Sequence, residues 1–167
     1  MSHIPKDFPY DFAHLEMKYP EIQGESSREI AVQSASTVMT YVKPPFILED
    51  SGLFINSLGG FPGPYSSYIF ETLGWEGILK LVGESRAAKF YSVIVYVDTD
   101  RDIHVFVGEV MGRITEEGRG DGGFGFDPIF VPEGHEQTFA EMGEEKNQIS
   151  HRSRSVLSFL NYLEKKV

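Results

Sequence analysis

The sequence contains no cysteine, which excludes disulfide bonds, thiolate catalysis and metal sites that use Cys ligands. It also lacks any run of about 18 apolar residues, so we expect no transmembrane helix. The N-terminal residues Met1-Ser2-His3-Ile4-Pro5 are not followed by the apolar segment of a secretory signal. These absences predict a cytoplasmic protein that does not associate with membranes.

Basic residues are scarce: there are 15 Lys and Arg against 25 Asp and Glu, and the formal net charge is −10. The basic residues are scattered singly, and no basic stripe runs along the chain. Because such a protein repels polyanions, we expect no nucleic-acid partner. An anionic small substrate would require locally arranged cations or Mg²⁺.

The chain of 167 residues has the length of one domain, and 41% of its residues are hydrophobic. It contains no internal repeat, no low-complexity tract and no linker long enough to separate two units. We therefore expect a single domain over residues 1–167.

Local patterns alternate between helix and strand periodicity, which predicts an α/β protein. A capping box at Ser26-Ser27-Arg28-Glu29 begins one predicted helix, and Ser150 is the expected N-cap of another. Gly74 is expected to separate two short helices, and the segment 118–125 has too many glycines for regular structure. The predicted helices cover 27–41, 68–73, 75–82 and a C-terminal segment with the apolar stripe Val156, Leu160, Leu163 and Val167. The predicted strands cover 46–48, 90–97 and 103–110. The last two strands are predicted to form a hairpin.

Acidic side chains are the first candidate site, comprising Glu21, Glu25, Glu49 and Asp50. Residues 49–52 are predicted to form a polar turn where the short strand 46–48 ends. Carboxylate oxygens are ligands that Mg²⁺ prefers, and Mg²⁺ often bridges protein carboxylates to substrate phosphates. The alternative interpretation is that residues 49–52 are only a solvated turn.

Two further segments carry candidate binding groups. Phe124-Gly125-Phe126-Asp127-Pro128 places two aromatic rings and a carboxylate where they could hold a purine, although the rings could equally be packing groups. The segment 146–152 contains Lys146, His151 and Arg152 beside a predicted helix N-terminus, which favours an anion; the alternative is an ordinary capped helix.

These segments, with Glu21-Ile22-Gln23 and residues 60–66, resemble the inosine triphosphate pyrophosphatase family in both order and spacing. The resemblance extends from about Glu16 to the C-terminus. It implies Mg²⁺-dependent hydrolysis of non-standard purine nucleoside triphosphates (ITP, dITP and XTP) to the monophosphate and pyrophosphate. It also implies an α/β fold with a mixed, twisted sheet and flanking helices, two lobes around a nucleotide cleft, and a homodimer.

The resemblance also implies roles for individual residues. Glu21 and Asp50 would hold Mg²⁺, Asp50 would be the catalytic base, and Glu49 would support it. Residues expected to bind substrate are Ser51, Phe124, Gly125, Phe126, Asp127, Lys146, His151 and Arg152. A guanidinium has only donors, so Arg152 would favour the 6-oxo group of hypoxanthine or xanthine over the amine of adenine.

The sequence departs from the family pattern in two places. It has no Thr/Ser-x-Asn-x-x-Lys segment, which in the family forms the loop that binds the triphosphate. In addition, Ser34 stands where the family usually has a phosphate-binding Lys. Two alternatives to a working enzyme follow: a catalytically impaired nucleotide-binding or interaction protein of the same fold, or a sequence that begins at an internal start.

Overall fold

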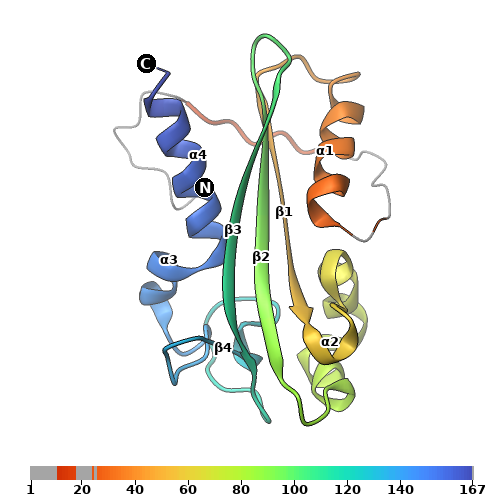
Figure 1. Ribbon diagram of the computed structural model, residues 1–167, viewed down its shortest axis with the longest axis vertical. Helices are drawn as coiled ribbons and strands as arrows, with labels where there is room; N and C mark the ends of the chain where they lie inside the picture. Colours follow the sequence, from red (N-terminus) through yellow and green to blue (C-terminus); the bar gives the residue numbers. More distant parts are fainter. Residues whose placement is uncertain (1–10, 18–23, 25, 167) are drawn as a thin grey trace.

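The computed structural model describes residues 11–17, 24 and 26–166. Its centre is a four-stranded sheet in the order β1-β2-β3-β4, which runs along the length of the molecule (Figure 1). All three strand pairs are antiparallel within these residues, whereas we expected a mixed sheet. The strands are β1 Phe46–Ile55, β2 Ala87–Val97, β3 Ile103–Ile114 and β4 Phe130–Pro132.

Helices flank this sheet, which confirms the α/β class. No helix in the described ranges is both long and apolar enough to cross a membrane. The α-helices are α1 Ser27–Val38, α2 Ser66–Leu81, α3 Lys146–Ile149 and α4 His151–Glu164, and short 3₁₀ turns occupy 56–58, 63–65, 127–129 and 143–145.

Helices α1 and α4 cover opposite faces of the sheet. Successive side chains of a strand point to opposite faces, so Val93, Val95 and Val97 of β2 pack against α1. Ile94 and Tyr96 point the other way and pack against Phe159 of α4 and its neighbours. We refer to these as the α1 face and the α4 face of the sheet.

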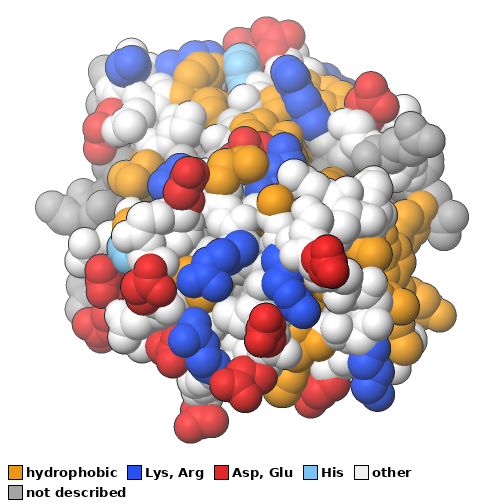
Figure 2. Space-filling model, turned by 60° about the horizontal axis from the view of Figure 1, so that its bottom comes forward, with side chains coloured by type: hydrophobic (Ala, Val, Ile, Leu, Met, Phe, Trp, Pro, Cys, Tyr) orange, Lys and Arg blue, Asp and Glu red, His pale blue; other side chains and the backbone are white. Residues whose placement is uncertain are grey.

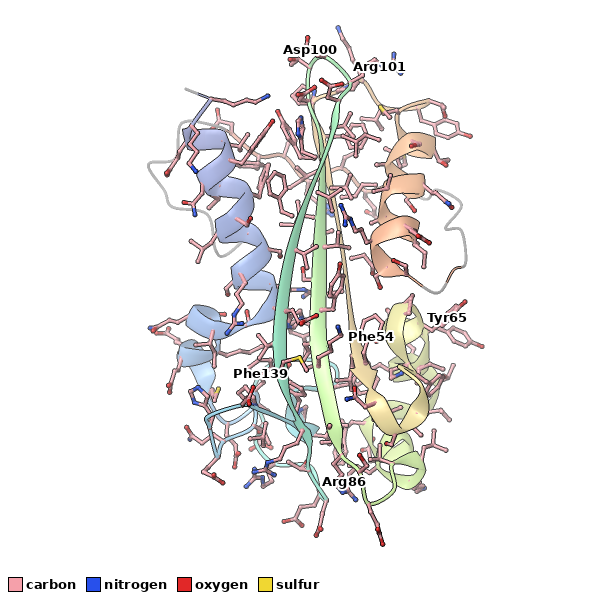
Figure 3. The ribbon with its side chains drawn as sticks, in the orientation of Figure 1. Phe54, Tyr65, Arg86, Asp100, Arg101 and Phe139 are labelled. Atoms are coloured by element: carbon pink, nitrogen blue, oxygen red, sulfur yellow. The ribbon has the colours of Figure 1, made fainter. Side chains whose placement is uncertain are left out.

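A third apolar cluster lies on the α4 face, at the end of the sheet away from the β2–β3 hairpin. Leu53 of β1 and Phe90 of β2 pack there with Ile78 of α2 and with Phe130 and Phe139. Phe139 and Phe54 therefore lie on opposite sides of the strands (Figure 3). This packing gathers α2, the segment 118–142 and the N-terminus of α4 around one end of a single face.

Several local predictions are confirmed. Ser150 is the N-cap of α4, because its Oγ accepts a hydrogen bond of 3.2 Å from the Ser153 N–H. Gly74 breaks α2 into two parts, with φ 66° and ψ −178°. The hairpin forms as predicted with longer strands, whereas the first helix ends at Val38, three residues before the predicted end.

The predicted turn at residues 49–52 is wrong, because β1 continues through it to Ile55. Glu49 pairs with Ile94 of β2 and Asp50 pairs with Val93. The long partner strand supplies ladder hydrogen bonds across the whole polar segment, and these override the local preference of its residues for a turn. The two carboxylates therefore sit within a strand and not at its end.

The end of the molecule opposite the hairpin has a mixed surface. In Figure 2 the Lys and Arg side chains on this face lie among Asp and Glu side chains and do not form a patch of one sign. This face offers no broad basic surface of the kind that nucleic-acid binding requires.

Candidate functional site

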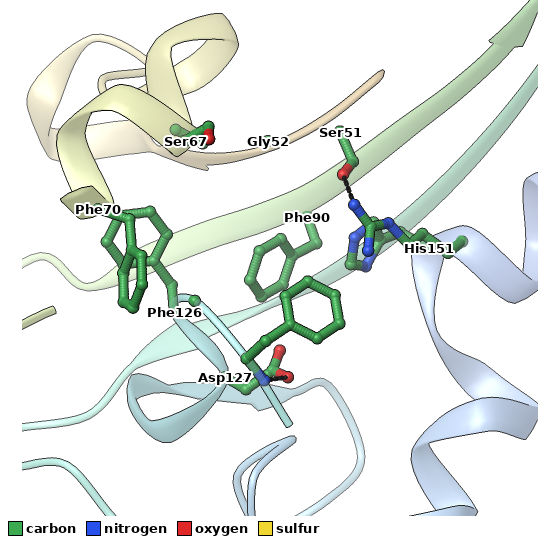
Figure 4. Close-up of a pocket in the computed structure, with 12 residues that line it drawn as sticks. Ser51, Gly52, Ser67, Phe70, Phe90, Phe126, Asp127 and His151 are labelled. Carbon is green, nitrogen blue, oxygen red and sulfur yellow. Dashed lines mark hydrogen bonds between the residues drawn. The ribbon is translucent and has the colours of Figure 1, made fainter. Parts of the chain in front are cut away.

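A cavity of about 270 Å³ opens on the α4 face between β1, α2, the loop 124–127 and the N-terminus of α4 (Figure 4). It brings together seven of the predicted substrate-binding residues, which come from three separate parts of the chain. Those seven are Ser51, Phe124, Gly125, Phe126, Asp127, His151 and Arg152, and the remaining lining residues are Gly52, Ser66, Ser67, Phe70 and Phe90.

The Arg152 guanidinium is fixed by β1. Its Nε donates to Glu49 Oε1 at 3.0 Å. Its Nη2 donates to Ser51 Oγ at 2.9 Å, which is the dashed line at Ser51 in Figure 4. Glu49 and Ser51 are two residues apart on one strand, so both side chains lie on the α4 face. The guanidinium carbon lies 4.7 Å from the centroid of the Phe124 ring. A donor-only group is thus held at the cavity beside an aromatic ring.

His151 lies in the wall of the cavity, stacked on Phe90 with ring centroids 4.6 Å apart and planes 7° from parallel. Burial of the imidazole, with smaller effects of Arg152 and Lys146, lowers the pKa of His151 to about 3. The side chain is therefore neutral at physiological pH. Its Nδ1 is buried and has no hydrogen-bond partner among the described residues.

Asp127 and Lys146 form a buried pair beneath the loop. Asp127 Oδ2 accepts hydrogen bonds from Lys146 Nζ and from the Phe124 N–H, the latter at 2.8 Å. A Cβ at Gly123, whose φ is 73°, would lie 2.1 Å from the same oxygen, so this position requires glycine. Lys146 does not itself line the cavity; it holds Asp127, and its Nζ lies 4.4 Å from the centroid of the Phe124 ring.

A second hollow, of about 720 Å³, lies between α1, β1 and the segment 61–71. Asp50, Glu49 and Ser34 line it, and Ser67 lines both this hollow and the smaller cavity. Asp50 pairs with Val93, whose side chain lies on the α1 face, whereas Glu49 is on the α4 face with Arg152. The strand thus separates the two neighbouring carboxylates: Glu49 binds Arg152 on the α4 face, and Asp50 lines the larger hollow on the α1 face.

The lining of the larger hollow is acidic and offers oxygen donors. Among the described residues, Glu49, Asp50 and Glu71 line it and neither Lys nor Arg does, but the Glu49 carboxylate is bonded to Arg152. Such oxygen donors suit Mg²⁺, which protein sites usually hold through one or two carboxylates together with substrate phosphates. No group of three potential ligands is close together in the part of the chain that is described. The other predicted ligand, Glu21, lies outside the described residues, so its role stays a prediction.

Sequence reasoning did not identify Gly52, Ser66, Ser67, Phe70 and Phe90 as lining residues. Ser66 Oγ accepts from the Leu53 N–H at 2.8 Å and donates to the Gly63 carbonyl at 2.7 Å, tying α2 to β1. A Cβ at Gly52 would lie 2.2 Å from that carbonyl. The two glycines that meet here, Gly52 and Gly63, are visible in the sequence as a signal of close packing. Phe70 and Phe90 carry no such signal and look like ordinary core residues.

Comparisons with known proteins identify the family of this chain. Residues 3–162 match the Ham1 family. The chain is 53% identical to the dITP/XTP pyrophosphatase of Thermococcus kodakarensis over 152 residues, covering 89% of this chain and 82% of that protein. It is 49% identical to the dITP/XTP pyrophosphatase of Methanopyrus kandleri, covering 92% and 83%. The solved structure of the Staphylococcus aureus Ham1 protein superposes with a TM-score of 0.82 at 31% identity, covering 91% and 83%. This chain belongs to the Ham1 family.

Proposed function

We propose that this chain is a nucleoside triphosphate pyrophosphatase that hydrolyses ITP, dITP and XTP to the monophosphate and pyrophosphate. The observation that carries the proposal is the pair of hollows that meet at β1. The smaller one holds the aromatic rings and Arg152, and the larger one holds Asp50. A purine nucleotide has two ends with matching requirements, an aromatic base and a chain of phosphates.

The base occupies the smaller cavity in this proposal. Phe124 and Phe126 flank it, and Gly125 between them leaves room for the approach of the ring. Arg152, oriented by Glu49 and Ser51, donates to the 6-oxo group. The guanidinium cannot accept a hydrogen bond from the 6-amino group of adenine. With an adenine nucleotide, the guanidinium and the amino group would face each other as two donors without an acceptor. Asp127 and the neutral His151 complete the contacts to the base edge.

The triphosphate extends past Ser67 into the larger hollow, where Asp50 acts as the general base. A water oxygen forms a bond to the α-phosphorus, its proton passes to the Asp50 carboxylate, and the bond from the α-phosphorus to the α–β bridging oxygen breaks. The products are the nucleoside monophosphate and pyrophosphate. Asp50 and Glu21 would hold Mg²⁺, which would supply neutralisation of the phosphate charge.

Two further properties belong to this proposal, and the second of them rests on the family resemblance. The protein acts in the cytoplasm, and it works as a homodimer.

Product identity tests the proposed reaction. The protein is incubated with dITP and Mg²⁺, and phosphorus NMR identifies the products, with a chelator added to a parallel sample. We expect equal amounts of dIMP and pyrophosphate, and no turnover in the chelated sample. Release of inorganic phosphate with dIDP would show attack at the γ-phosphorus and would overturn the assignment. Binding of dITP by calorimetry without turnover would instead favour the catalytically impaired nucleotide-binding protein.

A further inference from the structure

Two buried hydroxyls lie beneath the Glu49–Arg152 ion pair. Ser92 of β2 and Ser155 of α4 are both 0% exposed, and their Oγ atoms are 2.9 Å apart. They lie between the sheet and α4, and Ile94 and Phe159, the next residues along β2 and α4 on this side, belong to an apolar cluster. A buried hydroxyl in such a place is costly unless it is hydrogen-bonded, so the partners of this pair are informative.

The fold brings the two serines together through Gly108. Gly108 of β3 is the register partner of Ser92, and a Cβ there would lie 1.9 Å from the His151 carbonyl oxygen and 2.6 Å from the Ser155 nitrogen. The backbone of α4 therefore rests directly on β3 at this point. That close approach places Ser155 over Ser92 and sets the height of the first turn of α4, which carries His151 and Arg152.

The hydrogen bonds of the pair lead to Glu49 and Arg152. Ser92 Oγ donates to Glu49 Oε1 at 3.2 Å, and Ser155 Oγ donates to the Arg152 carbonyl at 3.0 Å. The two hydroxyls carry two protons for three contacts, because an ionised carboxylate and a carbonyl only accept. The charge of Glu49 draws the Ser92 proton to its carboxylate, and the Ser155 proton is then shared between the Ser92 oxygen and the Arg152 carbonyl.

Glu49 Oε1 thus receives two donors, the Ser92 hydroxyl and Arg152 Nε. The side chains of Glu49 and Arg152 are 34% and 36% exposed, so solvent competes for their ion pair and the pair alone holds its geometry weakly. Ser92 is the fully buried member of this set of contacts. The hydrogen bond from Ser92 holds the Glu49 carboxylate in place, and this restricts the positions that the Arg152 guanidinium can take against it.

We propose that Ser92, supported by Ser155, is a positioning residue that orients Arg152 through Glu49 and thereby sharpens the selection of 6-oxo purines. The proposal rests on the function proposed above for its effect on selectivity. Its structural part, the restraint of the Arg152 guanidinium, stands independently of whether the protein turns over a nucleotide.

The kinetic test compares kcat and KM for dITP and dATP in the wild type and in Ser92→Ala, Ser155→Ala and Val95→Ala. We expect Ser92→Ala to reduce the ratio of kcat/KM for dITP to that for dATP by about tenfold, the factor that corresponds to about 1.4 kcal/mol. The loss should appear mainly in KM for dITP. Ser155→Ala leaves the Ser92 proton to Glu49, so its ratio should fall by less than Ser92→Ala causes.

Val95→Ala is the control for stability, because Val95 is a fully buried residue of β2 that packs on the α1 face, away from this network. It should lower the melting temperature and leave the ratio unchanged. A Ser92→Ala protein that loses stability as Val95→Ala does, with an unchanged ratio, would show that the hydroxyl only serves folding and would overturn the proposal. Recovery of the ratio in Ser92→Thr would support it.

A second measurement separates failure of this proposal from failure of the proposed function. The Arg152 Nε–H signal in a proton–nitrogen NMR spectrum is assigned by its absence from Arg152→Lys, and its exchange with water is measured without any nucleotide. We expect severalfold faster exchange in Ser92→Ala than in the wild type or Val95→Ala. Unchanged exchange would contradict the restraint even if the enzyme is active, and faster exchange would uphold it even if the wild type releases no pyrophosphate.

Discussion

At the residue scale, the proposed selection of the base depends on a single side chain that only donates hydrogen bonds, Arg152. Arg152→Gln replaces the guanidinium with an amide that can both donate and accept, so the variant can pair with a 6-amino group as well as a 6-oxo group. We expect the preference for dITP over dATP, measured as the ratio of kcat/KM values, to fall by about tenfold to a hundredfold, since a hydrogen bond to a charged group contributes about 1.5–3 kcal/mol.

Arg154→Gln is the matched control for this prediction. Arg154 lies on the same helix, but its Nη1 donates to the Glu109 carbonyl and it does not line the cavity. Its removal should leave base preference unchanged. Equal preferences in the wild type and Arg152→Gln would show that selection of the base lies with other groups.

His151 makes stability depend on pH. Burial lowers the pKa of His151 to about 3 in the folded chain, while the unfolded chain has the ordinary value of 6.5. Between these values the unfolded state binds more protons, so stability is complete above about pH 6.5 and is lost progressively as the pH falls towards 3. At pH 5 the expected loss from this residue is about 2 kcal/mol.

The measurement is urea unfolding at pH 7.5 and pH 5.0 for the wild type and for His151→Phe, which keeps a ring against Phe90 and cannot titrate. The wild type should lose about 2 kcal/mol more than the variant over this interval. Equal losses in the two proteins would mean that His151 is not buried as a neutral imidazole.

The position of α4 on β3 decides at the element scale whether the cavity forms. A methyl group at Gly108 would overlap the backbone of α4 and push its first turn away from the sheet. We expect Gly108→Ala to lower the free energy of unfolding by about 1–3 kcal/mol and to raise KM for dITP, because His151 and Arg152 move together.

Gly83→Ala provides the comparison, since a Cβ at Gly83 would meet no atom within 4 Å and its backbone conformation accepts alanine. Stability and KM should both stay close to wild-type values there. A Gly108→Ala protein with a normal KM would show that the site tolerates displacement of α4.

The elements show which information the sequence carries locally. The Ser150 cap and the Gly74 break depend on neighbouring residues alone, and both could be predicted. The path of β1 through residues 49–52 could not be predicted, because it is stabilised by pairing with β2, some 40 residues away. The same strand geometry sends Glu49 and Asp50 to opposite faces of the sheet. A pair that looks like one acidic cluster in the sequence is therefore divided: Glu49 binds Arg152, and Asp50 lines the larger hollow.

The candidate site follows the same division. Motif residues such as Phe124, Asp127 and Arg152 could be identified from the resemblance, and they line or support one cavity. Phe90, Ser92 and Ser155 carry no local signal, because their roles depend on which strand and helix they face. The single-domain prediction and the role of Glu21 stay predictions.

At the scale of the whole molecule, part of the sheet lies beyond the cover of its helices. Val107 and Met111 of β3 have side chains on the α1 face and are 41% and 45% exposed, near the Phe54–Tyr91 ring pair. Exposed apolar side chains on a sheet face are suited to contact a second copy of the chain.

We expect the protein to sediment as a dimer and Met111→Glu to sediment as a monomer. A dimer that persists in the variant would place the interface elsewhere, and a monomeric wild type would refute dimerisation.

In the proposed reaction, Asp50 activates water for pyrophosphate release from deaminated purine nucleotides. This role is tested most directly by measuring pyrophosphate release from dITP, XTP, dATP and dGTP with Mg²⁺, using the wild type, Asp50→Asn and Asp100→Asn. Asp100 lies at the tip of the hairpin, at the far end of the molecule from the cavity (Figure 3), so its substitution controls for loss of an acidic charge. We predict activity on dITP and XTP that falls at least about a hundredfold in Asp50→Asn and is retained in Asp100→Asn. Equal activity of Asp50→Asn and the wild type, or no pyrophosphate from any triphosphate, would contradict the claim.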